Sequence, residues 1–141
     1  MDLLDSVKMI DFQQRGDDRG YLVVIEENKE IPFELKRIFY MYGSDTTVVR
    51  GQHANRKTEF VLVNVAGSSK VLVKDGLGNE REFVLDKAHS GIYIPRMIWK
   101  DMYDFSSDSI LLVLASELYD NTEYIRDYDE YTRVMRKEYR R

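Results

Sequence analysis

The chain has 141 residues, a length typical of one domain with a sizeable hydrophobic core, so we predict a single domain over residues 1–141. It has no cysteine, which excludes disulfides, a thiolate nucleophile and cysteine-type zinc sites, and its net charge of −4 argues against a nucleic-acid partner. It has no secretory signal pattern and no apolar run near the ~20 residues of a membrane-spanning helix, which argues against a membrane partner and fits a cytoplasmic location.

Short apolar segments separated by polar turns fill the chain up to residue 115. Segments of this length, rich in β-branched and aromatic residues, predict β-strands. We predict about nine strands, within residues 7–12, 21–25, 34–42, 59–65, 69–74, 82–85, 91–95, 98–103 and 110–115. We expect residues 13–20 to form a polar turn, residues 21–25 a buried strand, and the strongly apolar residues 110–115 a central strand.

The period of the pattern changes after Asp120. Apolar and aromatic residues then recur at three- and four-residue spacing, which predicts an amphipathic helix that Asp120 or Asn121 caps. Its buried face would contain Tyr124, Ile125, Tyr128, Tyr131, Val134 and Met135. The fold class predicted from this order is mainly β, a double-sheet sandwich or jelly roll closed by a C-terminal α-helix. The space between its sheets is a natural place for a small ligand.

Residues 50–57, Arg-Gly-Gln-His-Ala-Asn-Arg-Lys, lie between two predicted strands and combine polar and cationic side chains with a histidine. In extended backbone successive side chains face opposite sides, so His53 and Asn55 would share one face, with Arg50 nearby. A histidine and an amide on one face could hold a polar ligand against a sheet. The alternative is a solvated turn with a chance histidine.

The other chemical signals are weak. His89 lies in a predicted turn and is expected at the surface, so two histidines without cysteine make a metal site improbable. Neither a Gly-x-Ser-x-Gly elbow nor a phosphate-binding glycine loop is present. His53 with Asn55, tyrosines and arginines suits metal-free proton transfer next to a carbonyl, and it would serve a non-catalytic sugar-phosphate binder equally well.

Short segments along nearly the whole chain match one family in order. They include Arg50-Gly51-Gln52-His53-Ala54-Asn55, and they span residues 18–22, 25–26, 31–33, 36–40, 50–55, 91–95, 99–102, 104–106, 113–116, 119–120 and 124–126. Together they resemble the nucleotide-sugar 3,4-ketoisomerases. The resemblance implies a single cupin-type jelly roll that works without metal or cofactor as a homodimer with exchanged N-terminal strands. It further implies conversion of dTDP-4-keto-6-deoxyglucose to a dTDP-3-keto-6-deoxyhexose, upstream of an aminotransferase making 3-amino sugars for surface glycans such as the O-antigen of lipopolysaccharide.

The same resemblance implies the site residues. The catalytic group would be His53, Tyr40 and Asn55, and the substrate-binding group Arg19, Arg37, Arg50, Tyr93 and Lys100, with Arg50 at the pyrophosphate. Each of the arginines, tyrosines and the lysine also has an alternative role as a surface charge or a core tyrosine.

One departure from the family concerns Asn55. The family pattern is usually His-x-His, and an amide cannot move a proton between carbons. We therefore expect His53 to remove the C3 proton itself, or to share the task with a tyrosine or water, before an enediolate is reprotonated at C4. The alternatives are a related cupin epimerase and a catalytically silent nucleotide-sugar-binding cupin, for which Asn55 is the argument.

Overall fold

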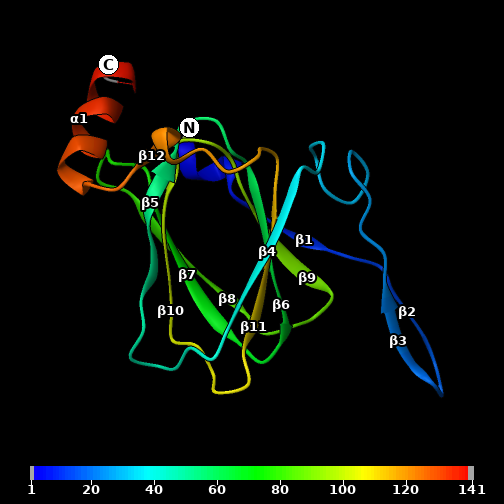
Figure 1. The fold of residues 1–141 in the computed structure, drawn as a ribbon. Coiled ribbons are helices and arrows are strands. Elements are labelled where there is room, and N and C mark those ends of the chain that lie inside the picture. Colours follow the sequence, from blue (N-terminus) through cyan, green and yellow to red (C-terminus); the bar gives the residue numbers. More distant parts are fainter. Residues whose placement is uncertain (1, 140–141) are drawn as a thin grey trace.

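Two five-stranded antiparallel sheets face each other in the computed structural model, which describes residues 2–139 (Figure 1). The first sheet has the strand order β1-β9-β6-β11-β4, and the second has the order β12-β5-β10-β7-β8. The elements are η1 (Leu3–Ser6), β1 (Lys8–Asp11), β2 (Gln14–Asp17), β3 (Gly20–Val23), β4 (Arg37–Tyr42), β5 (Arg50–Asn55), β6 (Phe60–Ala66), β7 (Ser69–Lys74), β8 (Glu80–Leu85), β9 (Ser90–Ile94), β10 (Trp99–Tyr103), β11 (Ile110–Ala115), η2 (Asn121–Glu123), β12 (Tyr124–Ile125) and α1 (Tyr128–Tyr139). The predicted double-sheet jelly roll with a C-terminal helix is confirmed.

Alternating side chains of the two sheets form the main core between them. Leu62 and Val113 of the first sheet and Val71 and Val73 of the second are all buried in this cluster. The outer face of the first sheet is covered in turn by the loop before β4, through Ile31 and other apolar residues. Because β6 is thus buried on both faces, its sequence is almost continuously apolar rather than alternating.

The N-terminal hairpin departs from the sequence prediction. Residues 14–17, expected in a turn, form β2, which pairs with β3 as a separate two-stranded sheet. The strand predicted at residues 21–25 is present over residues 21–23 as part of β3, but its predicted burial is wrong, because Tyr21 and Leu22 are 76% and 59% exposed. The hairpin extends away from the body of the chain, so apart from Val23, which packs against the outer face of the first sheet, its side chains are exposed (Figure 1).

The C-terminal helix begins later than its periodicity suggests. Asp120 caps the short η2, because its side chain accepts from the backbone N–H of Thr122. Tyr124 and Ile125 then pair with β5 and extend the second sheet, so α1 begins only at Tyr128. Strand pairing takes priority here over helical spacing. No helix within residues 2–139 is both long and apolar enough to cross a membrane.

Candidate active site

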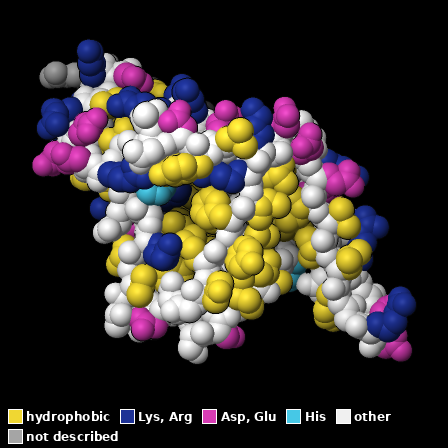
Figure 2. All heavy atoms as spheres, in the orientation of Figure 1, with side chains coloured by type: hydrophobic (Ala, Val, Ile, Leu, Met, Phe, Trp, Pro, Cys, Tyr) yellow, Lys and Arg dark blue, Asp and Glu magenta, His cyan; other side chains and the backbone are white. Residues whose placement is uncertain are grey.

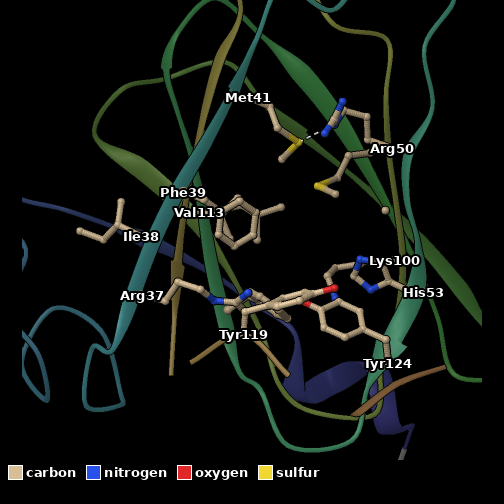
Figure 3. Close-up of a pocket in the computed structure, with 14 residues that line it drawn as sticks. Arg37, Ile38, Phe39, Met41, Arg50, His53, Lys100, Val113, Tyr119 and Tyr124 are labelled. Carbon is tan, nitrogen blue, oxygen red and sulfur yellow. Dashed lines mark hydrogen bonds between the residues drawn. The ribbon is translucent and has the colours of Figure 1, made fainter. Parts of the chain in front are cut away.

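A cavity of about 350 Å³ opens between the two sheets (Figure 3). Most of its lining comes from the inward faces of β4, β6 and β11 on one side and of β5, β10 and β12 on the other. The lining residues are Arg37, Ile38, Phe39, Met41, Arg50, Gly51, His53, Phe60, Leu62, Lys100, Met102, Val113, Tyr119 and Tyr124. A mixed apolar and cationic cavity of this size fits part of a small anionic ligand.

A β-bulge in β5 decides which of its side chains reach this cavity. His53 pairs with Lys100 and Gly51 with Asp101, so Gln52 is an extra residue with no partner in the register. Gly51 and Gln52 both have positive φ, 82° and 56°, and a Cβ on Gly51 would lie 2.9 Å from the Lys100 carbonyl oxygen. In a regular strand, the side chains of residues 50 and 53 would lie on opposite faces of the sheet. The bulge instead allows both Arg50 and His53 to line the cavity.

His53 lies in a strongly desolvated place. Burial, and then the positive charges of Lys100 and Arg126, lower the pKa of its imidazole to about 3. Its ring meets Tyr124 edge to face, with 4.8 Å between the centroids. The imidazole is therefore neutral at physiological pH, with a nitrogen lone pair that can accept a proton.

Lys100 is the second titratable group in the cavity. It lies directly opposite His53 on β10, and only 3% of its surface is exposed. Its Nζ donates to Asn55 Oδ1 at 3.2 Å and sits 4.2 Å from the centroid of the Phe60 ring. Burial lowers the pKa of its ammonium to about 7, and the nearby Arg37 guanidinium adds to that lowering, while Glu123 opposes it.

Glu123 supplies the negative charge behind this pair. Its carboxylate accepts from the backbone N–H groups of Lys57 and Thr58, at 2.8 and 3.1 Å, and from the Thr58 hydroxyl. Burial raises its pKa, but these hydrogen bonds outweigh burial and hold the pKa below its usual value. The side chain thus stays ionised, and it also ties the start of β12 to the end of β5.

Aromatic rings and a guanidinium form one end of the cavity. Arg37 lies beside Phe39 and Tyr119, with its Cζ at 5.2 and 5.6 Å from their centroids, and donates to Tyr124 Oη at 3.4 Å. Figure 3 shows these groups gathered around His53 and Lys100. At the other end Arg50 donates through Nε to Met41 Sδ at 2.8 Å, a weak acceptor that leaves the guanidinium free for a better one.

The structure thus brings together four of the predicted residues, His53, Arg37, Arg50 and Lys100, around the cavity. Asn55 does not line it but holds Lys100 from behind.

Three predicted residues lie elsewhere in the chain. Tyr40 is on the outer face of β4 and 61% exposed, because Arg37, Phe39 and Met41 take the inward positions. Tyr93 packs on the outer face of the first sheet and donates to Glu59. Neither side chain lines the cavity of this chain, so the site roles of Tyr40 and Tyr93 stay predictions.

Arg19 also lies outside the cavity. It is at the tip of the β2–β3 hairpin, where it pairs with Asp17 at 2.6 Å in an exposed position. Within one chain it is therefore a surface residue of a projecting hairpin.

Sequence reasoning missed Tyr119 and Tyr124 as lining residues. Both fall in segments that resemble the family, but the helical spacing after Asp120 directed Tyr124 to a helix face. A usable signal for β4 was present: alternation puts positions 37 and 39 on one face, so Arg37 and Tyr40 cannot both point inward.

Unpaired polar atoms mark the same place. Among residues 2–139, three buried side-chain polar atoms lack a hydrogen-bond partner, namely Arg37 Nε, His53 Nδ1 and Asn55 Nδ2. Buried polar groups in native proteins are nearly always hydrogen-bonded, so these atoms suit a site that receives a polar ligand. In the same residues no three His, Cys, Asp or Glu side chains converge as metal ligands would.

One family model and one curated relative match most of the chain. The family model described as "FdtA: WxcM-like, C-terminal" matches residues 5–136. A curated TDP-4-oxo-6-deoxy-alpha-D-glucose-3,4-oxoisomerase of Aneurinibacillus thermoaerophilus is 45% identical over 130 residues, which cover 92% of this chain and 93% of the relative.

Solved structures extend the comparison. QdtA, a sugar 3,4-ketoisomerase from Thermoanaerobacterium thermosaccharolyticum in complex with TDP, is 38% identical with a TM-score of 0.93, over 97% of this chain and 99% of that one. The 3,5-epimerase RmlC of Legionella pneumophila is 17% identical with a TM-score of 0.75, over 88% of this chain and 73% of that one. At that identity the epimerase shares the fold alone.

Proposed function

Since the chain belongs to the FdtA family, whose relatives include TDP-sugar 3,4-ketoisomerases, we propose that it converts dTDP-4-keto-6-deoxyglucose to a dTDP-3-keto-6-deoxyhexose. The observation that supports this most directly is His53, which is neutral and lies beside Lys100 on one wall of a desolvated cavity. The proposed reaction is proton transfer and needs neither a metal nor a cofactor. A 3-keto product is the substrate class that an aminotransferase would take to a 3-amino sugar, so we place the enzyme in deoxysugar biosynthesis for surface glycans, in the cytoplasm.

The first chemical step is removal of the C3 proton. That proton is acidic because C3 is adjacent to the C4 ketone. His53 accepts it, and the negative charge that develops on the C4 oxygen is stabilised by the cations of Lys100 and Arg37 in a medium of low dielectric. Return of the proton to C4 completes the shift of the carbonyl to C3.

Arg50 is our assignment for the pyrophosphate. Its guanidinium lies at the opposite end of the cavity from Arg37, and its one hydrogen bond within residues 2–139 is to a thioether (Figure 3). Phosphate oxygens match the guanidinium fork far better, so a bound nucleotide would displace Met41 from it.

We also propose a homodimer with exchanged N-terminal strands. Most side chains of the β2–β3 hairpin are exposed, and the outer face of the edge strand β4 exposes Ile38, Tyr40 and Tyr42. Figure 2 shows hydrophobic side chains at the centre of this face and charged ones around its rim. A second copy of the hairpin would cover such a patch and would carry Arg19 towards the partner's cavity.

Mixing two inactive variants tests this exchange. Co-folded Arg19→Ala and His53→Asn chains would form hybrid dimers in which one site holds both defects and the other holds neither. If hybrid dimers recover up to about half the activity of the unmodified dimer, the exchange is supported. If Arg19→Ala alone is inactive and mixing restores nothing, Arg19 acts within its own chain and the exchange is rejected.

Proton NMR in D2O with dTDP-4-keto-6-deoxyglucose tests the function. An isomerase moves the carbonyl to C3, and deuterium enters C4 whenever the imidazolium of His53 exchanges its proton with D2O before returning it. An epimerase leaves the carbonyl in place and changes only a configuration. A silent binder, the alternative that Asn55 favours, gives only a titratable shift of the dTDP signals. Either of the last two results would reject the proposed isomerase.

A further inference from the structure

The proposed isomerisation moves two protons, and His53 accounts for only one of them. One proton leaves C3 and reaches C4. The other leaves the hydroxyl on C3 and reaches the oxygen on C4, because the ketone and the alcohol exchange places. This second transfer also needs a group that can both give and take a proton.

We propose that Lys100 Nζ carries the oxygen-bound proton between the substituents of C3 and C4. The inference rests on the isomerase function proposed above. As His53 breaks the C3–H bond, the Lys100 ammonium donates a proton to the C4 oxygen and an enediol forms. The neutral amine then accepts the proton of the C3 hydroxyl while the imidazolium of His53 returns its proton to C4. Both side chains end in their starting states, so the protons balance.

The position of Lys100 supports this role. It pairs directly with His53 across β5 and β10, so the two side chains reach the cavity from adjacent points on one sheet face. Neighbouring carbon and oxygen atoms of one sugar need two groups placed in this way. The hydrogen bond to Asn55 Oδ1 and the contact with the Phe60 ring fix Nζ while leaving ammonium hydrogens for a ligand.

The other polar groups around the cavity fit the role less well. The guanidinium groups of Arg37 and Arg50 do not give up a proton in proteins, and the amide of Asn55 cannot carry one. Glu123 is occupied by three hydrogen bonds, which favour its ionised form.

The charges that face Lys100 come from several elements. The charged groups are Glu123 from η2 and Arg37 from β4, the neutral titratable groups beside them are His53 from β5 and Tyr124 from β12, and no carboxylate within residues 2–139 forms a salt bridge with Nζ. In this balance burial dominates and brings the pKa of Lys100 to about 7. A group with that pKa exchanges protons in both directions at neutral pH.

The test separates the two proton transfers in D2O. Lys100→Arg keeps a fixed cation but cannot release a proton, and Lys100→His restores a group that can. The matched control is Lys70→Arg, the same change at a lysine of β7 that pairs with Asp104 at the surface. For each protein, proton NMR follows both the loss of the C3 proton signal of dTDP-4-keto-6-deoxyglucose and the transposition of its ketone, and calorimetry measures the affinity for dTDP.

Our expectation is a split between the two rates. In Lys100→Arg, transposition should fall roughly 100-fold or more, the scale of general acid–base catalysis, while exchange at C3 stays within about tenfold of the unmodified protein. Lys100→His should recover much of the transposition, and Lys70→Arg should change nothing.

Three outcomes would overturn the inference. Parallel loss of exchange and transposition in Lys100→Arg would mean that Lys100 only stabilises charge, and undiminished transposition would mean that it is not needed. If the unmodified protein shows neither exchange nor transposition, the isomerase function itself is rejected, and the inference with it.

Discussion

The two walls of the cavity are both made of antiparallel strands, yet they carry different chemistry. The wall from the first sheet presents Phe39, Phe60, Leu62 and Val113, with Arg37 at its end. The wall from the second sheet presents Arg50, His53, Lys100 and Tyr124. The polar groups that could react with a substrate therefore lie almost entirely on one sheet.

The apolar wall nevertheless acts on the chemistry of the polar one. Burial is the largest cause of the lowered pKa both at His53 and at Lys100. Hydrophobic side chains opposite remove the water that would favour the charged forms of these two groups. The comparison teaches that the apolar wall, by excluding water, sets the proton affinity of the groups that face it.

The largest effect should come from removing His53, the proton-accepting group of the polar wall. His53→Asn should lower turnover by roughly 10²–10⁴-fold, because no remaining group in β5 can accept the C3 proton. Affinity for dTDP should stay nearly unchanged, since the reacting sugar rather than the nucleotide meets His53. Steady-state kinetics and calorimetry measure the two quantities, with His89→Asn as the same change in a turn outside the cavity. Activity above a tenth of the original would remove His53 from the role of base.

Removing the buried charge should stabilise the protein. The pKa of Lys100 falls from 10.5 to about 7 on folding, so the folded chain binds fewer protons than the unfolded chain between these values. The resulting destabilisation is complete below pH 7 and fades as the pH rises towards 10.5. Each pKa unit of this shift corresponds to about 1.4 kcal/mol of destabilisation. Lys100→Met removes that destabilisation but also loses the contacts with Asn55 and Phe60. The free energy of unfolding should therefore rise by roughly 2–3 kcal/mol at pH 6.

Urea denaturation at pH 6 and pH 10 measures that gain. The gain should shrink at pH 10, and Lys70→Met, which alters a surface lysine, should show no such pH dependence. An equal stability of Lys100→Met and the unmodified protein at pH 6 would contradict the buried charge.

The sequence predicts the scaffold better than the two walls. Alternation and turn residues identify most strands, and β11 falls on the predicted residues 110–115. Alternation and turn residues do not predict the bulge at Gly51 and Gln52, because the positive φ values there depend on the close approach of β5 to β10. The sequence placed Tyr124 in a helix for a related reason. Its pairing with Asn55 is a contact between distant parts of the chain, which local spacing does not encode.

Arg50 tests the polar wall at the end of the cavity opposite Arg37. A charge-assisted hydrogen bond contributes about 1.5–3 kcal/mol, so Arg50→Ala should raise the dissociation constant of dTDP roughly tenfold to a hundredfold. The matched control is Arg133→Ala on the exposed face of α1. Isothermal calorimetry at two salt concentrations should show the loss and a weaker salt dependence. Unchanged affinity would mean that Arg50 points away from the pyrophosphate.

The smallest expected effect tests the apolar wall alone. The Phe60 ring lies 4.2 Å from Lys100 Nζ and stabilises the ammonium through its π face. Phe60→Leu keeps the wall hydrophobic but removes that π face. A contact of 0.5–2 kcal/mol corresponds to roughly 0.4–1.5 pKa units, so the pKa of Lys100 should fall by about one unit. If the ammonium form starts the reaction, kcat/KM falls above the pKa of Lys100 in the free enzyme. The alkaline limb of its pH profile should then move from about 7 towards 6.

Phe105→Leu is the control, because Phe105 is equally buried but does not line the cavity, and it should leave the limb in place. A limb that stays near pH 7 in Phe60→Leu would show that water exclusion alone, without the ring, determines the proton affinity of Lys100.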